Sequence, residues 1–363
     1  MLKLRRGTVT ATDPLTVRVG GEERRAWADE GMVGEVREGD EVVVNVEAQD
    51  LGLGSGGFDV VHVNLTRGLD APGADGVHVM KLNYTSLQHP VEPVEEGATA
   101  AGGEGEGEAT RPRIPVLVLF LHGQLAPAAY AACTGAPGLR LGYVQTGGAA
   151  LPGSLSRDVA LLRRKSWLVD HVTAGPAYGG EREAISVVGA LDAGARLGWD
   201  AAVVGPGPGI LGSASTYGHG GISALDAAHA ALALDLPTLV APRFSSGDPR
   251  PRHRGLSHHA ETVLRMLLAP VRVPVPEVDD AEWPVMDEVD GSTALDRLRE
   301  ACGDRHDVWV REARLDDYRE EAARSGLPTT TMGRELAEDR LFFAAALAAG
   351  DALGASAEVE GEG

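Results

Sequence analysis

Apolar positions divide the chain into a region of short strands and a longer region in which strands and helices alternate. Residues 1–66 hold short Val-rich runs separated by Asp-Pro, Gly-Gly and Gly-Asp, a pattern that predicts strands joined by tight turns. The runs are LTVRVG, EERRAWAD, DEVVVNVEA and FDVVHVNL. We expect this region to form a small SH3-like or OB-like β-barrel.

From Ile114 onward the pattern changes to buried strands that alternate with helices. Strands are predicted at 115–121, 139–144, 167–172, 201–204 and 237–241, and helices at 125–133, 155–165, 181–197, 222–234 and 257–268. Strands that alternate with helices form a parallel sheet covered on both faces. The predicted fold class is therefore α/β: a Rossmann-like parallel sheet with helices on both faces, preceded by the barrel.

The remaining segments complete a three-part organisation. The run 77–87 predicts a strand, and the Pro, Glu, Gly and Ala composition of 91–113 predicts a disordered acidic loop. After 276 we expect helices at 291–302, 315–324 and 333–353, one strand at 306–310, a cap from Thr329–Thr331 and a frayed tail from Ala355. The predicted domains are 1–66, the barrel; 67–276, the Rossmann-like domain; and 277–363, a mostly helical extension that adds at most one strand.

Composition and net charge limit the kinds of partner that the protein is expected to bind. The formal net charge of −20 disfavours non-specific contact with nucleic acid and with anionic lipid. There is no run of 18 apolar residues, the first residues lack a signal-like apolar stretch, and the only cysteines are Cys133 and Cys302. We expect a cytoplasmic protein with a small anionic ligand, no nucleic-acid partner and no membrane partner. Whether the chain forms a homo-oligomer is left open.

The residues just after the predicted strands carry the candidate chemistry. Ligands bind open parallel sheets at the carboxyl ends of the strands. There the sequence places His122 after the first strand, Thr146 and Gly147 after the second, and a glycine loop after the fourth. These side chains and glycines predict a ligand cleft at this edge.

The glycine loop is the centre of that prediction. It comes after the strand at 201–204 and precedes a helix, which is how α/β proteins cradle anions. A nicotinamide cofactor is disfavoured, because the G-x-G-x-x-G match does not open the helix directly and no ribose-binding acid comes after it. A purely structural tight turn remains the alternative. The expected ligand-binding residues are Gly205, Gly207, Gly209, Gly212, Thr216 and His219.

A second constellation comes after the strand at 237–241. The stretch RFSSGDPRPRHRGLSHH forms a local cationic patch that ends at a predicted helix N-terminus, where an anion is favoured. We expect Arg243, Arg252, Arg254 and His258 to bind the anion, and His253 or His259 to transfer a proton. The alternative is a solvated loop whose arginines pair with surface carboxylates.

Two other chemistries find less support in the sequence. No metal site is predicted, because adjacent His258 and His259 diverge by about 100° on a helix. The stretch LFLHGQ is similar to the His-Gly of α/β-hydrolases, but no G-x-S-x-G elbow accompanies it. The cofactor is left unknown.

Several motifs together resemble one family. HRGLSHH, GPGPGILG, TGGAALPGSLSRDV, AYGGEREAI and MKLNYTSLQHP are similar to the bacterial domain of unknown function 3866, over about residues 2–276. The resemblance implies no activity. We expect a protein that binds, and that turns over if it is an enzyme, a small anionic metabolite of phosphorylated type. The alternative is a non-catalytic regulatory or scaffold protein that acts through its barrel and acidic surface.

Overall fold

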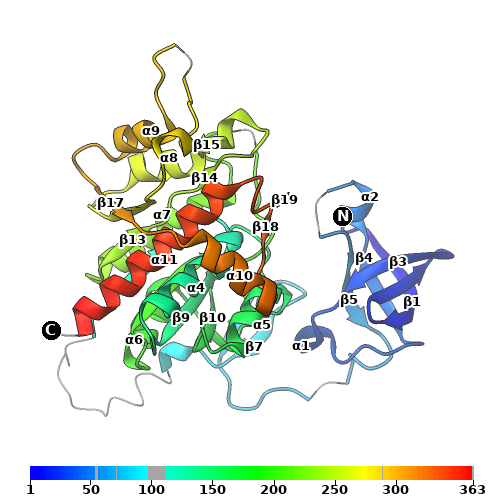
Figure 1. The fold of residues 1–363 in the computed structure, drawn as a ribbon. Coiled ribbons are helices and arrows are strands. Elements are labelled where there is room, and N and C mark those ends of the chain that lie inside the picture. The colour runs from blue at the N-terminus through cyan, green and yellow to red at the C-terminus, as the bar shows by residue number, and fades with distance from the viewer. Residues whose placement is uncertain (54–55, 71, 97–111, 214, 288, 362–363) are drawn as a thin grey trace, which may run out of the picture. The chain divides into compact units, whose positions relative to one another are not determined.

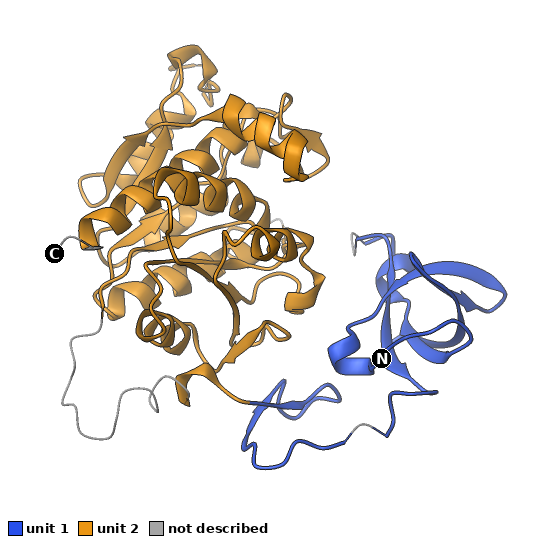
Figure 2. Cartoon of the chain, turned by 60° about the horizontal axis from the view of Figure 1, so that its bottom comes forward, with its two compact units in different colours: residues 1–91 blue, residues 92–363 orange. Residues whose placement is uncertain are grey.

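The structure is a computed structural model that describes residues 1–363 except 54–55, 71, 97–111, 214, 288 and 362–363. It contains two compact units, Met1–Val91 and Glu92–Gly363 (Figure 2). Most of the acidic loop expected at 91–113 lies outside the described residues.

The first unit contains a closed five-stranded barrel, which confirms the predicted barrel (Figure 1). Its strand order is β1-β2-β3-β5-β4, with β3 and β5 parallel and the other neighbours antiparallel, an OB-type arrangement. The strands are β1 (Leu4–Thr12), β2 (Leu15–Val19), β3 (Glu22–Trp27), β4 (Glu41–Asn45) and β5 (Asp59–Asn64). The sequence pattern missed β1, because Arg, Gly and Thr surround its one buried valine, Val9.

Two short helices and one hairpin complete this unit. The helices are α1 (Glu30–Val33) and α2 (Glu47–Asp50). β6 (Val79–Lys81) pairs with β7 (His89–Val91) in a separate antiparallel hairpin, within and just after the strand expected at 77–87.

The second unit is built on an eight-stranded parallel sheet, as the alternation of strands and helices predicted. The strand order is β11-β10-β9-β12-β8-β13-β16-β17. The strands are β8 (Val116–Val118), β9 (Leu141–Thr146), β10 (Asp170–Ala174), β11 (Arg182–Ala184), β12 (Ala201–Pro206), β13 (Thr238–Val240), β16 (Arg272–Pro276) and β17 (Asp307–Arg311). The inner strands are almost wholly buried, which explains their continuous apolar sequences.

Helices cover both faces of this sheet (Figure 1). One layer holds α4 (Leu125–Gly135), α5 (Arg157–Arg164), α10 (Leu315–Ser325) and α11 (Arg340–Gly361). The other holds α6 (Val187–Arg196), α7 (Ser223–Ala233), α8 (His258–Met266) and α9 (Ala294–Cys302). By length and composition α11 could span a membrane, but 72% of its apolar window is buried inside the protein.

Several predicted elements differ from those observed. The helix expected at 181–197 begins only at Val187, because 182–184 pairs with β10 as the edge strand β11. The 273–276 segment, for which the sequence pattern predicted no element, belongs to β16 and pairs with β17 despite its two prolines. The last helix begins at Arg340 and continues to Gly361, so the tail from Ala355 is helical. The threonines expected to cap it instead form β18 (Thr330–Thr331), which pairs with β19 (Arg334–Glu335).

Candidate functional site

The order of the strands places one group of loops at a switch point of the sheet. β8 lies between β12 and β13, and the chain proceeds from β9 to β11 toward one edge and from β13 to β17 toward the other. Ligands bind open α/β sheets where the strand order reverses, at the carboxyl ends of the strands. The loops after β8, β12 and β13 all begin there.

The glycine loop after β12 is fixed against the loop that begins at Gly147, directly after Thr146 ends β9. Leu211 N–H donates to Gly148 O at 3.1 Å, and Ala150 N–H donates to Pro208 O at 2.9 Å. A Cβ on Gly207 would lie 2.4 Å from Ala150 O, so this close approach requires glycine. Several loop N–H groups thus bond within the protein, and the loop serves to position the residues at its carboxyl end.

His219 lies at that carboxyl end of the glycine loop. An isolated bridge pairs Gly212 with His219, and the Nε2–H of His219 donates to Thr216 O at 3.0 Å. A carbonyl can only accept, so Nε2 of the neutral ring carries the proton and Nδ1 keeps a lone pair. That Nδ1 is buried and has no hydrogen-bond partner among the residues that the structure describes.

Two further histidines come from the first turn of α8. Ser257 caps this helix, as predicted, by accepting from His259 N–H. Although His258 and His259 are adjacent, their ring centroids lie only 4.3 Å apart. The divergence expected for neighbours on a helix therefore does not separate the two rings.

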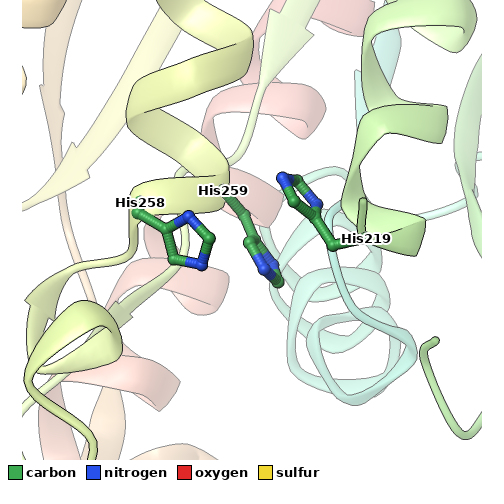
Figure 3. A group of neighbouring side chains, drawn as sticks. All are labelled: His219, His258 and His259. Carbon is green, nitrogen blue, oxygen red and sulfur yellow. The ribbon is translucent and has the colours of Figure 1, made fainter. Parts of the chain in front are cut away.

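His219, His253, His258 and His259 form one group, which we call the histidine cluster. His219 stacks on His259 with centroids 3.7 Å apart, and His253 lies 4.8 Å from His259 and 5.0 Å from His258. Figure 3 shows the ring of His259 between those of His258 and His219. One ligand nitrogen from each of His219, His258 and His259 lies within 4.8 Å of the others.

Arginines adjoin the cluster through His253. A terminal nitrogen of Arg243 lies 3.3 Å from His253 Nδ1, and Arg252 Nε lies 3.3 Å from His253 Nε2. Arg243 is 2% exposed and pairs with buried Asp248 at 3.1 Å, but its Nε–H has no acceptor in the described part of the chain. The short strands β14 (Phe244–Ser245) and β15 (Gly255–Leu256) join as a hairpin that holds this segment in place.

The cluster is neutral at physiological pH. Burial, followed by the charge of Arg243, lowers the pKa of His253 to about 3. Burial, followed by the neighbouring histidines, lowers the pKa of His259 to about 2 and also lowers the pKa of His258. Burial alone lowers the pKa of His219 despite its bond to Thr216. Neutral imidazoles offer lone pairs rather than positive charge.

Of the other predicted site residues, Gly212 and Thr216 reach the cluster through His219, whereas His122 lies elsewhere. His122 is buried after β8, where its Nε2 lies 2.7 Å from Ser156 Oγ and its Nδ1 lies 3.2 Å from Pro206 O. Within the described ranges no hydrogen bond or ring contact joins His122 to the histidine cluster. Arg254 is exposed, and Gly209 and Gly212 lie on the exposed part of their loop.

Sequence reasoning missed two residues of the site. Asp248 anchors Arg243, and Gly221 leaves room beside the rings: a Cβ there would lie 3.0 Å from His219 Nδ1 and 3.2 Å from His259 Nδ1. The two glycines that directly follow His219 are the signal in the sequence from which this close approach could have been inferred.

Comparison with known proteins gives a family and no activity. No curated protein and no solved structure matches the chain. The family model described as Protein of unknown function (DUF3866) matches residues 25–350, which confirms the resemblance and extends it from about residue 276 to residue 350. The chain belongs to this family of proteins of unknown function, DUF3866.

Proposed function

We propose that the chain binds a small anion, of phosphorylated-metabolite type, at the histidine cluster and its adjoining arginines. The observation that carries this proposal is a concentration of buried nitrogens that lack a partner among the described residues. They are His219 Nδ1, Arg243 Nε, His258 Nε2 and His259 Nδ1. A buried polar group without a partner costs about 1–3 kcal/mol, so several in one place favour a ligand site.

The arginines, and not the imidazole lone pairs, select an anion as the ligand, because an anion binds positive charge and accepts hydrogen bonds. Arg243 offers an N–H that only an acceptor can satisfy. Arg252 is exposed, has no carboxylate within 4.0 Å among the residues described, and lies near enough to lower the pKa of His258. In a chain with a net charge of −20, an arginine without a carboxylate partner among the described residues is a local positive centre.

The histidines in this proposal position the ligand. Both ring nitrogens of His253 face arginine nitrogens, so protonation would place a third positive charge between them. With a pKa of about 3 this ring stays neutral, and so low a pKa makes it a poor proton acceptor near pH 7. We assign it the positioning of Arg243 and Arg252.

Thermal unfolding of the full chain against a panel of anions tests the proposal. The panel contains inorganic phosphate, glucose 6-phosphate, ATP and sulfate. A ligand present at about 100 times its Kd adds roughly 2.7 kcal/mol to the unfolding free energy. We expect a stabilising shift with a phosphorylated member.

A pair of arginine variants locates the effect. Arg252→Gln is expected to abolish the shift, whereas Arg164→Gln, an exposed arginine at the end of α5, is expected to preserve it. No shift with any anion, or a shift that Arg252→Gln leaves unchanged, overturns the proposal.

A further inference from the structure

We infer that His219, His258 and His259 bind one divalent transition-metal ion such as Zn²⁺. The inference deepens the proposed function, on which it rests only for the anion. Binding of the ion itself depends on the three histidines and is argued from their geometry alone.

First, one nitrogen of each of the three imidazole rings has a lone pair to offer to a metal ion. His219 Nδ1 holds a lone pair because Nε2–H is committed to Thr216 O. His258 Nε2 and His259 Nδ1 are likewise buried and have no partner in the described chain. One ligand nitrogen per ring lies within 4.8 Å of the other two.

The second step is room for the ion. Gly221 lies beside both rings, and a Cβ there would approach His219 Nδ1 and His259 Nδ1 to 3.0 and 3.2 Å. Glycine at 221 therefore keeps open a space that both nitrogens adjoin. The backbone does not require glycine here, because Gly221 is absent from the residues with positive φ.

The third step is the movement that binding requires. Bonds of about 2.0–2.1 Å to one ion bring ligand nitrogens to roughly 3.3 Å of each other. The ion must also lie in the plane of each ring, whereas the His219 and His259 planes are now 10° from parallel. Rotation of these rings, over about 1 Å at the nitrogens, opens the stack and completes the site.

The donor set decides the class of metal. Three imidazoles suit Zn²⁺, Co²⁺, Ni²⁺ or Cu²⁺, and oxygen-seeking Mg²⁺ and Ca²⁺ are disfavoured. Three protein ligands leave a fourth position open to water or to an anion. A metal in this place would offer that position beside Arg252 and Arg243, which links the ion to the proposed anion.

Zn²⁺ titration of the full chain, after EDTA treatment and exhaustive buffer exchange without any anion of the panel, tests the inference. Competition with a zinc-sensitive dye gives the stoichiometry and Kd. We expect one tight equivalent, with affinity reduced more than about 100-fold in His258→Gln, since even outer-shell changes cost 10–100-fold. His62→Gln, in the barrel strand β5, is expected to bind as the parent does.

Two glycine variants keep all three ligands and guard against misfolding. Gly221→Ala is expected to weaken Zn²⁺ binding at least about tenfold by filling the space, while Gly73→Ala, in the other unit and with no atom within 4 Å of its Cβ, is expected to leave Zn²⁺ binding unchanged. Absence of a tight equivalent, or tight binding that His258→Gln and Gly221→Ala retain, overturns the inference. Phosphate stabilisation of the metal-free chain, measured separately, reports on the proposed function, so the two failures are distinguishable.

Discussion

The imidazole rings of His219 and His259 stack with centroids 3.7 Å apart, although His219 lies in the loop after β12 and His259 in the first turn of α8. Nδ1 of each ring is buried and has no partner within the described structure. Two segments thus meet at the switch point of the sheet, and each brings a ring nitrogen that lacks a hydrogen-bond partner there. A protein under selection for stability alone would place apolar side chains there.

His259→Leu is expected to leave the ligand-free protein as stable as the parent or up to about 2 kcal/mol more stable, because it removes a buried nitrogen without a partner. Urea unfolding measures the difference. The matched control is His306→Leu, since His306 is similarly buried but bonds to Val271 N–H and Leu264 O. That control is expected to lose about 1–3 kcal/mol. Equal losses in both variants would contradict a functional origin for the cluster.

Asp248→Asn is expected to destabilise the protein by about 3 kcal/mol, because it leaves the buried guanidinium of Arg243 without its carboxylate. Burial alone would raise the pKa of Asp248, but hydrogen bonds and charge from Arg250, with the charge of Arg243, hold it well below its usual range. Asp192→Asn, in the exposed pair with Arg196, is expected to change stability by less than about 0.5 kcal/mol. Chemical denaturation compares the two, and a loss below about 1 kcal/mol for Asp248→Asn would count against this role.

Stability is expected to fall with acid through His171. Burial, followed by the charges of His122 and Arg163, lowers the pKa of this residue to about 3. Below about pH 6.5, the ordinary pKa of histidine, His171 binds a proton in the unfolded chain but not in the folded chain. This contribution is therefore complete above about pH 6.5 and is lost as pH falls toward 3.

In that window His171 alone accounts for a slope of about 1.4 kcal/mol per pH unit. His171→Gln retains a donor for Gln145 Oε1 and is expected to reduce the slope by this amount. Guanidinium unfolding at several pH values between 6 and 4 gives both slopes. Parallel curves for the two proteins would show that His171 does not cause the acid sensitivity.

Gly350→Ala is expected to cost about 1–3 kcal/mol, because its Cβ would lie 2.0 Å from Ala128 O where α11 packs along α4. Gly123→Ala, whose Cβ would meet nothing closer than 3.5 Å, is expected to stay within about 0.5 kcal/mol of the parent. Thermal unfolding ranks the two variants, and a silent Gly350→Ala would mean that the two helices can separate without cost.

The periodicity of apolar residues predicted the parallel sheet well, since its inner strands are buried on both faces. The apolar periodicity predicted elements less well where pairing with a neighbouring strand, and not the local sequence, decides the structure. β11 is three residues long and exists because β10 pairs with it, and β16 contains prolines that ordinarily argue against a strand.

The sequence predicted only part of the candidate site, again because contacts between distant segments decide the rest. His219, His253, His258 and His259 were singled out from loop position and composition, and the fold brings them together. The close approach of His259 to His219 depends on the first turn of α8 and on Gly221 beside both rings, which no helical periodicity encodes. The contribution of Asp248 required knowing that Arg243 is buried.

Diffraction from crystals of the full chain grown with ZnCl₂ and inorganic phosphate tests the central claim most directly, because anomalous scattering at the zinc edge locates the ion independently. The expected result is a peak bonded to nitrogens of His219, His258 and His259, with phosphate density at the guanidinium of Arg243 or Arg252. A well-ordered cluster with neither zinc nor phosphate, in a crystal where both occupy other places, would contradict the assignment of this cluster as the ligand site.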